Sequence, residues 1–320
     1  MKIAIAGSAG YTGGELIRLL INHPHTEITQ ILSQSQTGKP VHEVHQDLEG
    51  LTDLHFTTEL DDDFDALFLC MGHGRSGDFL AKNQIPDDKI IIDLSNEFRF
   101  KADNHNFVYG LPEWQRHKIK NSRRIANPGC FATGIQLALL PLAREGLING
   151  DIATTSITGS TGAGLRPGPT THFSWRSSNI SIYKLGNHQH IPEVYQSIRD
   201  LQPGYDADII MVPIRGDFSR GIFSSIHTDS TLEEKELVDL YQSYYADHPF
   251  TLVTTKDLNL KTVVNTNRAY LKIDKIGHKV HITSTLDNLI KGASGQAVQN
   301  LNLMAGWDET AGLTLKPSVY

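Results

Sequence analysis

Residues 2–20 read Lys2-Ile-Ala-Ile-Ala6-Gly7-Ser-Ala-Gly10-Tyr-Thr-Gly13-Gly-Glu-Leu-Ile-Arg-Leu-Leu20. A short apolar run, a glycine turn and an amphipathic segment follow one another, which predicts a strand, a tight loop and a helix. In that setting the glycines permit positive φ and close approach of a ligand, and the first helical turn offers N–H groups to a pyrophosphate. The stretch therefore predicts a dinucleotide-binding α/β fold. Its expected cofactor loop consists of Gly7, Ser8, Ala9, Gly10, Tyr11, Thr12 and Gly13.

The second predicted strand, residues 28–33, bears on the choice of dinucleotide. An NAD-selective fold usually places an acidic residue just after this strand, against the ribose 2′-hydroxyl. This chain has Ser33, Ser35 and Lys39 there instead, and hydroxyls with a cation suit a 2′-phosphate better. We therefore expect NADP, although a solvated loop would also explain these residues.

Two further apolar runs, residues 64–70 and 90–94, predict buried parallel strands. Ligands of doubly wound sheets bind beyond the carboxyl ends of such strands, so Gly72 and His73 are expected near the cofactor. Arg99 follows the second run. It could hold an anionic group of a substrate, or it could be a surface charge.

The stretch 125–134 reads Ile-Ala-Asn-Pro-Gly-Cys-Phe-Ala-Thr-Gly, a chain break followed by an apolar run. Cys130 is therefore predicted at the first turn of a helix. The unpaired amides and positive end of a helix favour thiolate over thiol. A free cysteine is more often a small buried residue, which is how we interpret Cys70 inside its apolar run. For Cys130 the turn, the helix and the dinucleotide signature favour a nucleophile.

The composition is that of an ordinary globular protein: 320 residues, 39% hydrophobic, 20% charged, formal net charge −7. This length predicts two domains. Two cysteines give no disulfide framework, and a reactive thiol needs a reducing compartment. No secretory or membrane-spanning run and no basic excess is evident, so we expect a cytoplasmic protein without membrane or nucleic-acid partners.

After about residue 150 the sequence changes to longer segments in which apolar and polar residues alternate, separated by loops. This pattern predicts an α+β second domain with a largely antiparallel sheet. We expect the last helix to return to the first domain. Residues 1–149 and 291–320 would then bind the dinucleotide, and residues 150–290 would form the second domain. Two loops, around Gly162 and Asn288, are expected to approach the cofactor, with a flexible connection as the alternative for the first.

His188 and His190 stand one residue apart, shortly before Glu193. On a strand they would share a face, so one could exchange a proton with a substrate while Glu193 orients a partner. The same set could equally be a metal site. Because no third ligand is evident from spacing and Cys130 supplies a competing role, we favour acid–base chemistry and expect no metal.

Together the motifs resemble the N-acetyl-γ-glutamyl-phosphate reductase family of arginine biosynthesis, in order and over nearly the whole chain. The matching stretches are residues 7–16, 23–25, 92–99, 109–113, 127–133, 188–193, 220–222 and 287–300.

The resemblance implies an NADP-binding Rossmann domain, joined to a catalytic and oligomerisation domain like that of aspartate-semialdehyde dehydrogenases, in a homodimer or homotetramer. The family's nucleophile falls on Cys130, and its acid–base motif falls on His188, His190 and Glu193, leaving open which histidine acts. Three polar residues in matched motifs are expected to bind substrate: Arg99, Asn127 and Arg220. Departures from the family pattern at residues 161–166 and at 189 leave open whether the acyl group is acetyl or larger, such as succinyl.

The expected reaction is reduction of an acyl phosphate. The Cys130 thiolate attacks the γ-acyl phosphate, phosphate leaves, and NADPH reduces the resulting thioester to a semialdehyde. One alternative is aspartate-semialdehyde dehydrogenase, which applies the same chemistry to a shorter substrate. The others are a metal-dependent hydrolase that uses the two histidines and Glu193, and a non-catalytic NADP-binding sensor with an inert Cys130.

Overall fold

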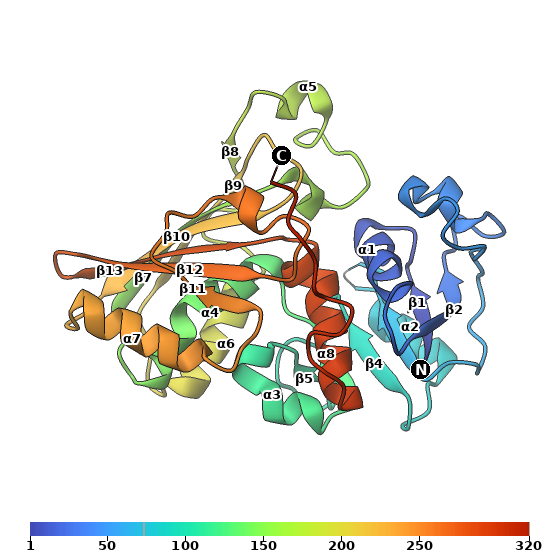
Figure 1. Cartoon of the computed structure of the whole chain (residues 1–320), viewed down its shortest axis with the longest axis horizontal. Coiled ribbons are helices and arrows are strands. Elements are labelled where there is room, and N and C mark those ends of the chain that lie inside the picture. The colour runs from blue at the N-terminus through green and yellow to red at the C-terminus, as the bar shows by residue number, and fades with distance from the viewer. Residues whose placement is uncertain (73, 320) are drawn as a thin grey trace. The chain divides into compact units, whose positions relative to one another are not determined.

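The structure, a computed structural model, describes residues 1–72 and 74–319 of the chain (Figure 1). The chain divides into two compact units. Unit 1 consists of Met1–Pro128 and Ala293–Thr314; unit 2 consists of Gly129–Gly292 and the C-terminal segment from Leu315. The division after residue 128 lies before the boundary at residue 149 that we took from the sequence, because helix α4 (Cys130–Arg144) packs against elements of unit 2.

Unit 1 is built on a six-stranded parallel sheet. Its strands, in sheet order, are β2 (Glu27–Leu32), β1 (Lys2–Ala6), β3 (Ala66–Leu69), β4 (Ile90–Asp93), β6 (Arg124–Ala126) and β5 (Val108–Tyr109). The strands predicted from apolar runs are present, and β3 and β4 are buried along their whole length, as a sheet covered by helices requires. The helices of unit 1 are α1 (Tyr11–Leu20), α2 (Ser76–Asn83), α3 (Pro112–Lys120) and α8 (Gly295–Ala305).

The strand order reverses at β1, which pairs with β2 on one side and β3 on the other. Open α/β sheets bind ligands at such a switch point, beyond the carboxyl ends of the strands. The loop that begins at Gly7 leaves β1 at this place, so the topology puts the predicted cofactor loop where a dinucleotide binds.

Unit 2 contains a seven-stranded mixed sheet. Its strands, in sheet order, are β11 (Thr251–Val253), β12 (Ala269–Ile276), β13 (Lys279–Leu286), β10 (Ile222–Asp229), β7 (Asn149–Thr158), β9 (Ile209–Arg215) and β8 (Ser181–Ile182). Pairing is parallel between β7 and β9 and between β11 and β12, and antiparallel elsewhere. The largely antiparallel α+β domain predicted from the sequence is therefore confirmed.

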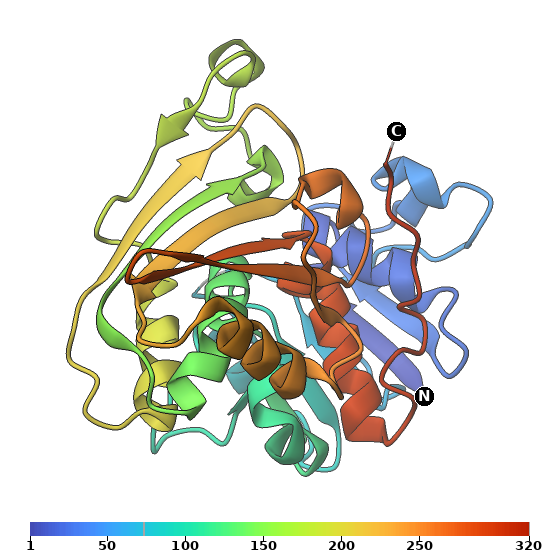
Figure 2. The same ribbon diagram turned by 60° about the vertical axis from the view of Figure 1, so that its left-hand side comes forward.

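Helices α4, α6 (Ile191–Leu201) and α7 (Glu234–Tyr245) lie on one face of this sheet (Figures 1 and 2). Alternate residues of β10, such as Ile222, Ser224 and Ile226, are buried on that face. Helix α5 (Phe173–Arg176) belongs to the long connection between β7 and β8.

Shorter turns fill the remaining connections: the 3-10 helices η1 (Val41–Glu43), η2 (Gln46–Leu48), η3 (Ser160–Ala163) and η4 (Leu260–Thr262), and the π-helix η5 (Ile290–Ser294). Within the described residues, no helix combines the length and the apolar character needed to cross a membrane.

Candidate active site

Cys130 is the first residue of α4, as the sequence predicted, and Gly129 is its N-cap. The helix has no acidic residue in its first turn, so no carboxylate of its own opposes a negative charge there. The amides and dipole of a helix N-terminus stabilise a thiolate. Cys130 is only partly buried.

Two side chains of the predicted acid–base motif, His190 and Glu193, lie against Gly129. Its amide N–H donates to Glu193 Oε2 over 2.9 Å. A Cβ at this position would lie 2.3 Å from His190 Nε2 and 2.8 Å from Glu193 Oε1. Only glycine allows this approach, which brings the His190 imidazole against the residue that precedes Cys130.

Gly292, in the π-helix η5, lies against Cys130 itself. A Cβ on Gly292 would be 2.7 Å from Cys130 Cβ, so the π-helix presents bare backbone to Cys130. Single π-turns of this kind occur often at functional sites. The sequence offered no sign of this contact, because the two residues are far apart in the chain.

Arg220 supports the start of this π-helix through Asp287. Its Nε and Nη2 donate to the two Asp287 carboxylate oxygens over 3.1 and 3.2 Å. The buried Asp287 also accepts from the amides of Leu289 and Ile290. Arg220, which we predicted to bind substrate, therefore contributes to the position of the backbone beside Cys130.

His188 and His190 are not on a strand, and this correction removes the shared-face argument made from their spacing. They form the turn before α6, which has Pro192 in its first turn. The turn nevertheless brings the rings together, with centroids 4.7 Å apart, and the His190 amide donates to His188 Nδ1 over 3.3 Å. Both rings also contact Phe131, which follows the nucleophile.

The two histidines differ in their surroundings. Burial, together with the smaller effect of the positive charge of Lys184, lowers the pKa of His188 to about 4. His188 is therefore neutral near pH 7. His190 is buried too, but its Nε2 faces Gly129, which directly precedes Cys130.

Arg99 and Asn127, two further predicted substrate residues, form part of the framework of unit 1. Arg99 is buried and its Nε donates to the Asn127 carbonyl over 2.9 Å. The Asn127 amide group donates to the Ala293 carbonyl over 3.0 Å, and Asn127 Oδ1 accepts from Asn300 over 3.2 Å. These bonds hold Asn127, which lies three residues before Cys130.

The cofactor loop fits a pyrophosphate. Gly7 has φ +76°, and a Cβ there would lie 2.6 Å from the Cys70 carbonyl oxygen. Gly13 packs as closely against the Ser8 backbone. Gly10, the N-cap of α1, provides no side-chain cap, and the first turn of α1 has no acidic residue, so the amides are available to an anion.

The other residues predicted to bind the cofactor fall in both units. Ser33 Oγ and Ser35 Oγ lie 3.4 Å apart after β2, and Lys39 is exposed further along the same loop. Ser8 Oγ donates to the Leu32 carbonyl, and the Thr12 carbonyl accepts from Ser294.

Gly162 and Asn288 belong to unit 2. The Asn288 side chain donates to Thr161 Oγ1 over 3.1 Å and accepts from the Gly221 amide over 2.7 Å. Gly72, three residues after β3 ends, has φ +83°. His73 lies outside the described residues.

Cys70 has the opposite environment to Cys130. Burial raises the pKa of its thiol to about 12, so the thiolate is absent at neutral pH. Cys70 directly follows β3 and is partly exposed as a residue, so it lies at the edge of the core where we had expected it inside a core strand. The raised pKa of its thiol leaves Cys130 as the candidate nucleophile.

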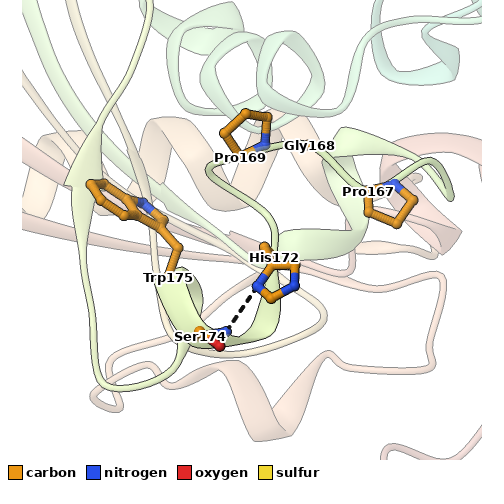
Figure 3. A pocket seen from close by; sticks show the side chains of 6 residues that line it. All are labelled: Pro167, Gly168, Pro169, His172, Ser174 and Trp175. Atoms are coloured by element: carbon orange, nitrogen blue, oxygen red, sulfur yellow. Dashed lines mark hydrogen bonds between the residues drawn. The ribbon is translucent and has the colours of Figure 1, made fainter.

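A hollow in the connection between β7 and β8 is lined by Pro167, Gly168, Pro169, His172, Ser174 and Trp175 (Figure 3). It contains none of the residues predicted to carry the chemistry. In residues 1–72 and 74–319, no group of three or more His, Cys, Asp or Glu side chains is arranged to hold a metal ion.

Fold and site together define a semialdehyde dehydrogenase. Residues 2–122 match the family model described as the semialdehyde dehydrogenase NAD-binding domain, and residues 130–288 match that of the semialdehyde dehydrogenase dimerisation domain. Aspartate semialdehyde dehydrogenase II from Vibrio cholerae has the same fold, with TM-score 0.74 and 16% identity over 95% of this chain and 98% of that one. The enzyme from Candida albicans, whose structure includes NADP, has TM-score 0.70 and 14% identity over 95% of this chain and 97% of that one.

Relatives with similar sequences identify one family within the semialdehyde dehydrogenases. N-acetyl-gamma-glutamyl-phosphate reductases from Phocaeicola vulgatus and Bacteroides thetaiotaomicron are 52% and 51% identical, each over 100% of both chains. That from Christiangramia forsetii is 48% identical over the same extent. The chain belongs to the N-acetyl-gamma-glutamyl-phosphate reductase family and is therefore an oxidoreductase.

Proposed function

We propose that this chain reduces N-acetyl-γ-glutamyl phosphate to N-acetylglutamate 5-semialdehyde and releases phosphate, through a thioester on Cys130. The observation that carries the proposal is the position of Cys130 at the start of α4, directly after a glycine against which His190 packs. The names of relatives about 50% identical over the full chain support the choice of substrate.

The proposed steps use side chains and amides of unit 2. The Cys130 thiolate attacks the γ-carbonyl carbon, a C–S bond forms, and the phosphate leaves with its electron pair. Amides in the first turn of α4 stabilise the oxyanion. NADPH, when bound, supplies the hydride that reduces the thioester. His190 then protonates the thiohemiacetal oxygen and takes the proton back as the C–S bond breaks and the semialdehyde leaves.

We assign the proton transfer to His190 and the positioning of its neighbours to His188 and Glu193. The low pKa of His188 makes it a poor proton carrier near pH 7. The buried Glu193 accepts from the Gly129 amide and contacts the same glycine as His190. Glu193 would therefore fix the position of the His190 imidazole relative to the loop that precedes Cys130.

For the cofactor we propose that the loop from Gly7 to Gly13 binds the pyrophosphate. The missing acidic residue after β2, with Ser33, Ser35 and Lys39 in its place, supports NADP. The NADP in the Candida albicans structure supports this choice for the fold.

We also propose that the chain works as a homodimer or homotetramer in the cytoplasm, without nucleic acid. The match of residues 130–288 to a dimerisation domain supports self-association. Several large apolar side chains stand exposed between β7 and the turn before α6: Leu165, Phe173, Trp175, Ile180, Ile182 and Leu185. Equilibrium sedimentation tests this point, and a single-chain mass at micromolar concentration would contradict it.

The test of the proposed function is an assay in the oxidative direction. Purified protein is given NADP⁺, phosphate and one of three aldehydes: N-acetylglutamate semialdehyde, its N-succinyl counterpart, or aspartate semialdehyde. We expect phosphate-dependent NADPH formation that is fastest with the N-acetyl compound. Preference for the N-succinyl compound would correct the acyl group, and preference for aspartate semialdehyde would overturn the assignment.

A further inference from the structure

Arg215 of unit 2 is a cation without a neutralising partner among the residues that the structure describes. It ends β9 and lies next to Ser181 of β8 in the sheet. Its Nη1 donates to Thr170 Oγ1 over 3.3 Å, while its Nε is buried and has no hydrogen-bond partner. Among the described residues, no carboxylate lies within ion-pair distance of this guanidinium.

Tyr183 connects Arg215 to the histidines of the active site. The Arg215 guanidinium carbon lies 4.5 Å from the centre of the Tyr183 ring, and that ring lies 5.8 Å from the His188 ring. Burial raises the pKa of Tyr183, and negative charge on Cys130 raises it further, while Arg215 lowers it. The Tyr183 hydroxyl is thus within electrostatic range of both the nucleophile and the cation.

We propose that Arg215, held on the face of Tyr183, binds a carboxylate of the substrate that reacts with Cys130. This rests on the proposed function, whose substrate carries such a group. A planar guanidinium matches a carboxylate with two parallel N–H donors, and stacking on an aromatic ring orders it in advance. A carboxylate would also provide the partner that the buried Nε lacks.

Two other cations of unit 2, Arg220 and Lys184, already have hydrogen-bond partners. Arg220 is bound to Asp287 through two nitrogens. Lys184 is exposed and donates to Gln189 Oε1 over 2.8 Å. Arg176 also has a buried Nε without a hydrogen-bond partner, but its Nη1 and Nη2 donate to Ser181 Oγ and the Asn179 carbonyl. Arg215 combines an unsatisfied Nε with stacking on the tyrosine beside His188, so the geometry assigns the anion to Arg215.

The test compares Arg215→Met and Arg215→Lys with Arg199→Met as the matched control. Arg199 also stacks on a tyrosine, with its guanidinium carbon 4.5 Å from the Tyr195 ring, but it stands in the last turn of α6 and donates to the Tyr205 carbonyl. Losing a charge-assisted hydrogen bond of this kind should raise KM for N-acetylglutamate semialdehyde by roughly 10- to 100-fold in Arg215→Met. KM for phosphate and NADP⁺ should stay unchanged, and Arg199→Met should behave as wild type.

Arg215→Lys should fall between wild type and Arg215→Met, because it keeps the charge but loses the fork. A substrate analogue with a carboxamide in place of the α-carboxylate locates the group that is bound. If the defect disappears with the carboxamide, Arg215 binds the α-carboxylate. If the defect persists with the carboxamide, which carries no other carboxylate, Arg215 does not bind a carboxylate of this substrate and the proposal fails.

A rise in the phosphate KM instead, or an unchanged aldehyde KM in Arg215→Met, would overturn the proposal even if the wild-type enzyme is active. Failure of the wild-type enzyme to oxidise either acylated semialdehyde would refute the proposed function itself, so the two failures are distinguishable. Circular dichroism and NADPH titration of every variant show whether a defect comes from misfolding.

Discussion

His188 is a buried imidazole that the fold keeps neutral, with its pKa lowered to about 4 by burial and by Lys184. An unfolded histidine titrates near 6.5. Between pH 4 and pH 6.5 the unfolded state binds more protons than the folded state. The neutral His188 therefore contributes fully to the free energy of unfolding above pH 6.5, and this contribution is lost as the pH falls toward 4.

We therefore predict that wild type loses more stability between pH 7 and pH 4.5 than His188→Asn does. The difference should be on the order of 1–3 kcal/mol in the free energy of unfolding, measured by urea titration at each pH. Equal losses in the two proteins would show that His188 does not titrate in this way.

The division of roles between the two histidines gives a second prediction. His190→Asn should slow single-turnover reduction by about 10²- to 10⁴-fold, the usual effect of losing one positioned proton carrier, while NADPH affinity stays near wild type. His188→Asn should have a smaller effect. A larger defect in His188→Asn would exchange the two roles, and metal bound in stoichiometric amount and lost from both variants would favour a metal site instead.

Lys39 is exposed after β2 and provides a third prediction. If it contacts the 2′-phosphate, Lys39→Ala should weaken NADPH more than NADH, by roughly 3- to 30-fold for the loss of one charged hydrogen bond at an exposed site. Fluorescence titration with both cofactors measures this difference. Equal weakening of both would mean that the preference for NADP has another source.

At the scale of elements, two glycines of helix α4 differ in the space available for a side chain: Gly129, the N-cap, and Gly134, within the helix. A Cβ at Gly129 would collide with His190 and Glu193, whereas one at Gly134 would meet Leu286 and Ser284 at ordinary contact distances of 3.4 and 3.5 Å. Gly129→Ala should therefore destabilise the protein by about 1–3 kcal/mol and reduce turnover.

Gly134→Ala is the control on the same helix. It should be neutral or stabilise the protein by up to about 1 kcal/mol, since alanine favours helix more than glycine does. Thermal unfolding and steady-state assays of both variants test this contrast. Normal activity in Gly129→Ala would contradict the close packing of His190 against the nucleophile loop.

Strands and helices followed from the sequence wherever a periodic apolar pattern coincided with turn residues, as in β1, α1 and α4. The prediction that residues 188–193 include a strand was wrong, because we applied strand periodicity to a turn that leads into a helix. Pro192 and Glu193 in the first turn were the available signal. The contacts of Gly292 with Cys130 and of Arg215 with Tyr183 join distant parts of the chain, and no local pattern encodes them.

At the scale of the whole molecule, the chain forms two units, and unit 1 is completed by residues 293–314 from the far end of the sequence. We expected this return of the last helix from the sequence, where a glycine-containing loop leads into the helix, but local patterns do not say where a helix packs. The division also shows which unit holds each group: the cofactor loop lies in unit 1, and Cys130, His190 and Glu193 lie in unit 2.

The central claim is that Cys130 carries the acyl group. The most direct measurement mixes the protein with NADP⁺ and N-acetylglutamate semialdehyde without phosphate, so that a thioester forms but is not released. We predict a burst of one NADPH per active site and, by mass spectrometry, one N-acetylglutamyl group on Cys130. Cys70→Ser should retain the burst and Cys130→Ser should lose it. A burst without the adduct, or turnover of more than a few per cent in Cys130→Ser, would contradict the covalent mechanism.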